Sequence, residues 1–141
     1  EFQYRFLHDI IVNRLWLFRW KISESSTCRL CSLYQESIAH MFWDCKYVAK
    51  FWKLFADKFD DKIGSHVNMT NVFIGTENSL FCSVVFNAKR YIYKCFMLNS
   101  QPNFLVFTRK LQYICNIEKQ IMHNKMEKWR KKWQAISDDI L

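Results

Sequence analysis

The chain is poor in the two residues that make tight turns, with two glycines and one proline among 141 residues. All-β sandwiches and barrels need many turns and depend on these residues. No apolar run approaches the roughly 18 residues of a membrane span. Charged residues interrupt the first twenty positions, so no signal-peptide core forms there. These absences favour helices joined by short loops in an intracellular protein of the nucleus, the cytoplasm or both, with no membrane partner.

Aromatic and basic residues are abundant instead. Half of the residues are hydrophobic and 18% are aromatic, including 13 Phe, six Trp and six Tyr. This content can build a real core and argues against disorder. The 21 Lys and Arg outnumber the 13 Asp and Glu, which gives a formal net charge of +8. Such a charge favours a polyanionic partner such as nucleic acid, although a solvated basic surface explains it equally well.

Apolar residues recur at helical spacing along most of the chain. Asn13 is the expected N-cap of a short helix over residues 14–21, although the alternating aromatic residues at 16–20 leave an extended segment open. Asn103 is expected to cap a later helix. Further helices are expected at 46–60 and 79–98, whereas 71–75 is either a brief helix or a strand-like piece.

Two C-terminal segments carry their own stripes of apolar residues. The stripe expected after Asn103 consists of Phe104, Phe107, Leu111, Ile114, Ile117 and Ile121. The lysine-rich ending has Trp129 and Trp133 at helical spacing. These two tryptophans belong either to the core or to a surface that stacks on bases.

The strongest local signal is a group of four residues of metal-ligand type within 18 positions. In chain order they are Cys28, Cys31, His40 and Cys45, with the pattern C-x2-C-x8-H-x4-C. Two Cys separated by two residues can share one ion, because the turn between them directs its amides at the thiolates. Residues 36–43 have helical character, so Cys45 must lie past the end of that helix, where the chain bends back.

Three Cys and one His fill a tetrahedron, so we predict one structural zinc ion with no open position for catalysis. The other interpretation, ordinary buried cysteines beside a core histidine, explains this clustering poorly, because the remaining Cys are scattered. We expect those three as core residues, and the remaining histidines either at the surface or with their hydrogen bonds satisfied. They are Cys82, Cys95 and Cys115, and His8, His66 and His123.

The predicted fold class is therefore all-α: a small helical domain built around a CCHC zinc knuckle, with long C-terminal helices. Residues 1–62 are expected to hold a helical lead-in, the knuckle (residues 28–45) and the following helix. Residues 63–141 are expected to form a helical extension that packs on it.

Several stretches around the four ligands are similar to one known family. They are 26–31 (STCRLC), 36–45 (ESIAHMFWDC), Val48, Phe51-Trp52, 7–11 (LHDII), 88–95 (AKRYIYKC), 102–104 (PNF) and 118–133. Together they resemble the zinc-binding region at the C-terminus of reverse transcriptases from LINE-type (non-LTR) retrotransposons. In that family a Glu precedes the His by four residues, as Glu36 precedes His40 here. The resemblance is specific at the knuckle and covers nearly the whole chain.

The resemblance implies a non-catalytic region that helps a reverse transcriptase polyprotein to hold template RNA or target DNA during target-primed reverse transcription. The chemistry agrees in kind, because basic side chains neutralise phosphates and aromatic rings stack on unpaired bases. The candidate contacts to single-stranded or template-primer nucleic acid are Arg29, Lys46, Tyr47, Lys50, Lys128, Arg130 and Lys131. For Trp43 and Trp52 we favour a core position. The alternative function is a structural or protein-interaction module that packs against the polymerase or a host factor without binding nucleic acid.

The chain lacks the motifs of the enzymes that accompany this region. A polymerase needs carboxylates that hold two metal ions, and the Asp pairs at 60–61 and 138–139 lack the aromatic residue and the hairpin that such a motif requires. A nuclease motif built on Pro-Asp is missing as well, because Pro102 is followed by Asn103. We therefore predict a fragment without enzymatic activity of its own, and we expect both Asp pairs at solvated helix ends.

Overall fold

A computed structural model describes residues 1–140 of the chain, with the side chain of Asp139 excepted. The described part is helical, and its β-structure is limited to one isolated bridge between Thr27 and Gln35. The all-α class predicted from the sequence is confirmed. None of its helices has the length and apolar character that crossing a membrane requires.

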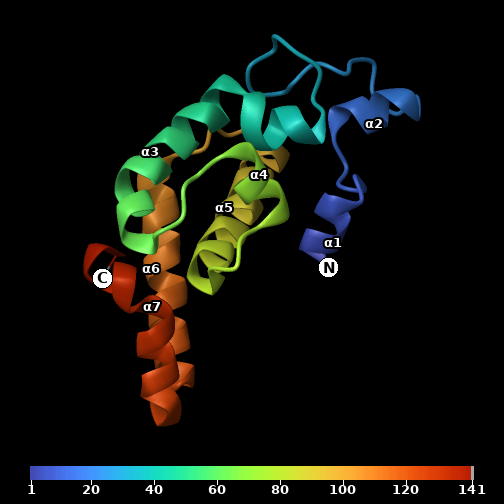
Figure 1. The fold of residues 1–141 in the computed structure, drawn as a ribbon. Coiled ribbons are helices and arrows are strands. Elements are labelled where there is room, and N and C mark those ends of the chain that lie inside the picture. The colour runs from blue at the N-terminus through green and yellow to red at the C-terminus, as the bar shows by residue number, and fades with distance from the viewer. Residues whose placement is uncertain (141) are drawn as a thin grey trace. The chain divides into compact units, whose positions relative to one another are not determined.

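The helices follow one another along the chain as labelled in Figure 1. Their bounds are α1 (Phe2–Leu7), α2 (Arg14–Arg19), the π-helical turn η1 (His40–Asp44), α3 (Lys46–Ile63), α4 (Met69–Ile74), α5 (Ser79–Met97), α6 (Phe104–Ile121), the 3-10 turn η2 (His123–Lys125) and α7 (Met126–Ile140).

Asparagine side chains cap the N-termini of several of these helices. Asn13 Oδ1 accepts a hydrogen bond from the Trp16 amide at 3.0 Å, and Asn103 Oδ1 accepts one from the Leu105 amide at 2.9 Å. Each satisfies an amide that the first turn leaves without a backbone partner. Both predicted caps are confirmed, and the extended alternative for residues 16–20 is wrong. Of the piece at 71–75, residues 71–74 lie in the helix α4, which Asn68 caps in the same way.

The chain divides into two compact units, and each combines two separate stretches. Unit 1 consists of 1–53 and 88–102, and unit 2 of 54–87 and 103–141. The units therefore differ from the expected division at residue 62, because α3 and α5 each contribute residues to both. Whether 1–62 and 63–141 behave as separate domains stays a prediction.

Unit 1 buries aromatic side chains from α1, η1, α3 and α5. The rings of Phe6 and Phe42 meet edge to face at 4.9 Å between centroids, a geometry that aromatic pairs favour. Lys89, also buried, donates from Nζ to Gln3 Oε1 at 2.7 Å and lies 4.3 Å from the centre of the Phe6 ring. These contacts pack α1 and α5 within the unit that contains the four candidate ligands.

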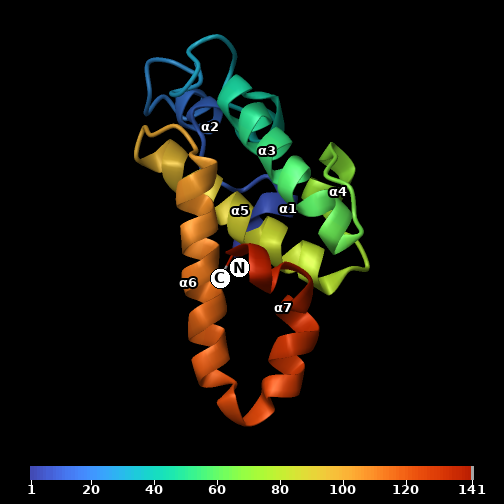
Figure 2. The same cartoon turned by 90° about the vertical axis from the view of Figure 1, so that its left-hand side faces the viewer.

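Unit 2 is built largely on a hairpin of helices. α6 and α7 run antiparallel and are joined by η2 (Figure 2). The indole of Trp129 donates to the Cys115 carbonyl at 3.1 Å, and that of Trp133 donates to Glu118 Oε2 at 2.8 Å. Both rings are buried, so they belong to the core and are not available for stacking on bases.

The stripe expected on α6 is wrong in its second half. Phe107 and Leu111 are buried as expected, but Cys115 continues the buried face, whereas Ile117 is 37% and Ile121 75% exposed. Residues four positions apart, such as Phe107, Leu111 and Cys115, stay on one side of a helix, whereas residues 114, 117 and 121 turn away from that side. The side of α6 that α7 covers carries the residues spaced by four positions.

Candidate metal centre

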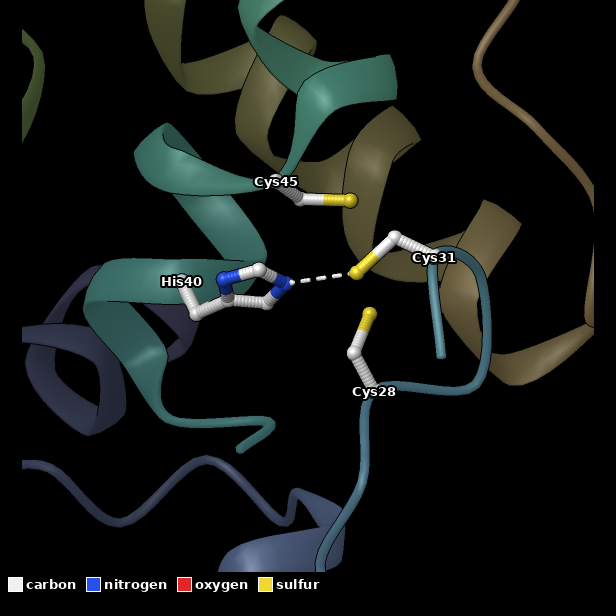
Figure 3. A group of neighbouring side chains, drawn as sticks. All are labelled: Cys28, Cys31, His40 and Cys45. Atoms are coloured by element: carbon white, nitrogen blue, oxygen red, sulfur yellow. Dashed lines mark hydrogen bonds between the residues drawn. The ribbon is translucent and has the colours of Figure 1, made fainter. Parts of the chain in front are cut away.

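Four side chains from separate parts of unit 1 converge on one point. The three Sγ atoms of Cys28, Cys31 and Cys45 and a ring nitrogen of His40 all lie within 4.8 Å of one another. All four residues are buried, and Figure 3 shows them pointing toward a common centre. Within the group, His40 Nε2 lies 3.3 Å from Cys31 Sγ. The structure thus brings together all four of the predicted ligands.

The cluster has the dimensions and the donor set of a structural zinc site. Tetrahedral zinc with Zn–S bonds of about 2.3 Å and a Zn–N bond of about 2.0–2.1 Å holds its ligand atoms roughly 3.5–3.8 Å apart. Separations of at most 4.8 Å therefore close around one ion with small side-chain movements. Three Cys and one His complete the coordination, so the group would fix structure and offer no position for a water or a substrate.

A tight loop presents the first two cysteines. The Cys28 amide donates to the Tyr34 carbonyl at 2.7 Å, and the Ser32 amide donates to the Cys28 carbonyl at 2.9 Å. Ser32 adopts a left-handed backbone conformation with a φ of 56°, which turns the chain back after Cys31. The bridge from Thr27 to Gln35 closes the base of this loop. The knuckle turn expected from C-x2-C is therefore present.

The second pair of ligands depends on a π-helical turn that the sequence did not reveal. The Cys45 amide donates to the His40 carbonyl at 2.9 Å, five residues back along η1. In an ordinary α-helix a residue five positions further along points about 140° away from the starting residue. The wider π turn returns Cys45 to the side occupied by His40, consistent with the tendency of such turns to occur at functional sites. The prediction that Cys45 follows the helix end is confirmed, but the wide turn was missed.

A buried carboxylate ties the knuckle loop together. Glu36 Oε1 accepts from the Arg14 amide at 2.9 Å, and Oε2 accepts from the Arg29 amide at the same distance. The Arg29 guanidinium also donates to both carboxylate oxygens, including a bond from Nη2 to Oε1 of 2.8 Å. Glu36 is fully buried, so this one side chain joins α2 to the first cysteine pair. In the sequence, only the family pattern draws attention to Glu36.

Arg29 consequently has a structural role. Its side chain is 11% exposed, and Nη1 makes a further contact with the Phe96 carbonyl at 3.4 Å. A guanidinium with this geometry stays hydrogen-bonded to its carboxylate, since charge-assisted bidentate pairs are among the strongest side-chain hydrogen bonds. The guanidinium of Arg29 is therefore not available for the nucleic-acid contact that the sequence predicted.

Contact between the sulfurs of Cys28 and Cys45 shifts their pKa values in opposite directions. A hydrogen bond from Cys45 lowers the pKa of Cys28 to about 4, against the opposing effect of burial. The same contact with Cys28, together with burial, raises the pKa of Cys45. Cys28 thus favours the thiolate form and Cys45 the protonated form, because the hydrogen bond between them stabilises that arrangement. A divalent cation would stabilise all three cysteines as thiolates, which is the donor chemistry that zinc requires.

The other expected nucleic-acid contacts lie in both units. At the start of α3, Lys46 and Lys50 are exposed and Tyr47 is half-buried, with Lys46 Nζ 5.0 Å from the centre of the Tyr47 ring. On α7 the remaining candidates are exposed, namely Lys128, Arg130 and Lys131. Lys131 also pairs weakly with Glu127 at 3.9 Å.

Most of the tryptophan and cysteine side chains that we expected in the core are buried. Trp52 is buried and its indole donates to the Phe42 carbonyl at 2.7 Å, whereas Trp43 is half-buried. Cys95 and Cys115 are buried and Cys82 is half-buried. The three other histidines, His8, His66 and His123, are exposed.

The Asp pair at 60–61 has a local structural role. Asp60 accepts from the Val67 amide at 3.2 Å, which closes the loop after α3. The second pair includes Asp139, whose side chain lies outside the described residues. Within residues 1–140 the four-residue cluster at the knuckle is the group of His, Cys, Asp and Glu side chains placed to hold a metal.

Comparison with known proteins identifies the part of the chain that contains this centre. Residues 1–52 match the family described as zinc-binding in reverse transcriptase. The match includes all four ligands, Glu36 and the start of α3. It is a match to a zinc-binding family and not to a catalytic one. No curated protein and no solved structure matches the chain.

Proposed function

We propose that this chain is a non-catalytic, zinc-stabilised nucleic-acid-binding region of a LINE-type (non-LTR) reverse transcriptase. In this role it would help the polyprotein to hold template RNA or target DNA during target-primed reverse transcription, inside the cell. The observation that carries the proposal is the closed Cys3His cluster, which lies within the residues that match a reverse-transcriptase zinc-binding family.

The proposed cofactor is one zinc ion, held by Cys28, Cys31, His40 and Cys45. When bound, the ion would supply only a fixed junction between the knuckle loop and the start of α3, because its four positions are filled by the protein. Zinc binding to small sites of this kind contributes roughly 10–16 kcal/mol of apparent free energy. That contribution can order residues 20–37, a stretch without a helix of its own.

The distribution of charge supports nucleic acid as the partner. Unit 1 holds eleven Lys and Arg against five Asp and Glu, a formal net charge of +6, and unit 2 holds ten against eight, a net charge of +2. The excess positive charge is therefore concentrated in the unit that contains the metal centre. Lys46 and Lys50 are exposed beside the last ligand, where phosphates can reach them.

A salt titration of binding tests this proposal. We expect the zinc-loaded chain to bind a fluorescent single-stranded RNA with an affinity that falls steeply with salt, measured by anisotropy. Each phosphate contact to a single strand contributes about 0.7 to the slope of log K against log salt. The double variant Lys46→Ala/Lys50→Ala should therefore have a slope shallower by about 1.4.

The matched control removes two positive charges from unit 2. Arg109→Ala/Lys125→Ala changes exposed residues and should leave the slope nearer to that of the parent chain. If the two double variants behave alike, Lys46 and Lys50 are not part of the interface. If the zinc-loaded chain does not bind RNA or DNA at low salt, the proposal is wrong and the alternative, a module that packs against the polymerase or a host factor, is favoured.

A further inference from the structure

The helix α2 exposes aromatic residues that a folded domain normally buries. None of its six residues is buried. Phe18 is 47% exposed, and Trp20, which ends the helix, is 54% exposed. Scattered exposed apolar residues need no explanation, but neighbouring exposed aromatic rings mark interaction surfaces.

The exposed ring of Trp20 lies close to the half-buried ring of Trp16, beside a positive charge. The centroids of Trp16 and Trp20 are 5.6 Å apart and their planes are inclined by 32°. The guanidinium carbon of Arg19 lies 5.2 Å from the centre of the Trp16 ring, a cation–π contact. We call Trp16, Arg19 and Trp20 the α2 platform. Lys21, exposed, follows directly in the chain.

The platform is anchored to the metal centre within unit 1. Asn13 caps the helix through the Trp16 amide, and the next residue, Arg14, donates from its amide to Glu36 and from Nη1 to the Thr27 carbonyl at 3.2 Å. Glu36 in turn holds the loop of the first cysteine pair. A short helix fastened at this end presents its aromatic rings in a fixed position, which lowers the entropy lost when a ligand binds.

The positive charge around the α2 platform indicates which kind of ligand the platform can bind. Between residues 14 and 27 the chain carries Arg14, Arg19 and Lys21 against a single acidic residue, Glu24. A ligand that suits this surface has flat apolar faces and negative charge in alternation. Unpaired nucleotides have both, since each base can stack on an aromatic ring while its phosphate meets Arg or Lys.

We infer that the α2 platform stacks unpaired bases of a single-stranded nucleic acid, with Arg19 and Lys21 at the adjoining phosphates. This inference rests on the proposed function and adds the site at which bases, rather than phosphates alone, are recognised. It assigns a role to residues that belong to neither the metal centre nor the basic start of α3. An apolar protein segment is the competing occupant, and it is favoured if the test shows that the bases do not contribute to binding.

The test compares two substitutions and two ligands in the zinc-loaded chain. Trp20→Leu keeps an apolar side chain but removes the ring, whereas Trp20→Phe keeps a ring. The ligands are a single-stranded oligonucleotide and an abasic oligomer with the same number of phosphates. Loss of one base–aromatic stack weakens binding by about 5- to 150-fold.

We expect that loss for Trp20→Leu with the base-containing oligonucleotide, near-parent affinity for Trp20→Phe, and no effect of either change on the abasic oligomer. Zinc content equal to that of the parent chain verifies the fold of both variants. The inference is overturned if Trp20→Leu leaves the affinity unchanged, or if it weakens both oligomers equally. If the parent chain binds both oligomers equally, the base-stacking role of the α2 platform is wrong, but binding through phosphate contacts is still supported. Binding to neither oligomer overturns the proposed function itself.

Discussion

Glu36 shows at the scale of a single residue how the knuckle is held. The sequence identifies the four ligands by type and spacing, because metal ligands are few and their chemistry is distinctive. It does not reveal that Arg29 turns toward Glu36, since the pairing depends on the folded loop. A basic residue beside a cysteine therefore predicted a phosphate contact, and the structure shows a buried ion pair.

Loss of the Glu36 carboxylate should destabilise the chain strongly. Glu36→Gln leaves the Arg29 guanidinium buried without a counter-charge, which costs about 3–5 kcal/mol in typical proteins. We expect a lower free energy of unfolding of that size in a denaturant titration of the zinc-loaded chain. The control is Glu24→Gln at an exposed position, which should change it by less than about 0.5 kcal/mol. Equal effects of the two substitutions would contradict the structural role of Glu36.

Cys115 should make the stability sensitive to alkaline pH. Burial raises its pKa from 9.0 to about 11, so the unfolded chain loses this proton at a lower pH than the folded chain does. The stabilising contribution is complete below pH 9 and is lost between about pH 9 and 11. We expect unfolding curves to show this loss in the parent chain and not in Cys115→Ala. The same pH dependence in both chains would rule out Cys115 as its source.

At the scale of the helices, the sequence predicted the caps and the strongly amphipathic elements well. α3 begins at Lys46 as expected, and its predicted stripe, which includes Phe51, Phe55 and Phe59, is buried. Local chemistry decides such features. The π turn η1 and the exposed end of α6 were missed, because a wide turn has no periodic signal and burial on α6 depends on where α7 packs.

Removal of the Asn13 cap should weaken α2 and the surface that it presents. Asn13 is buried and bonds both the Trp16 amide and the Ile11 carbonyl. Replacing such a cap by Ala costs about 0.5–2 kcal/mol. We expect Asn13→Ala to lower the free energy of unfolding by about that amount while zinc content stays unchanged. A stability equal to that of the parent chain would show that the cap is unimportant.

At the scale of the whole molecule, the proposed zinc ion would account for the order of a long irregular stretch. Residues 20–37 contain no helix, yet they carry two ligands and the carboxylate that fastens α2. Ligands must lose their protons to bind zinc, so the assembled site couples folding to metal. Unit 2 buries aromatic side chains in the α6–α7 hairpin and contains none of the four ligands.

The most direct test of the account is the metal content of the purified chain, measured together with its helicity before and after chelation. We predict one equivalent of zinc per chain, a marked loss of helical circular dichroism when a strong chelator removes it, and recovery when zinc is returned. Cys45→Ser should reproduce the chelated state. A chain that purifies without stoichiometric zinc, or that keeps its helicity and its melting temperature after complete removal of the metal, would contradict the account.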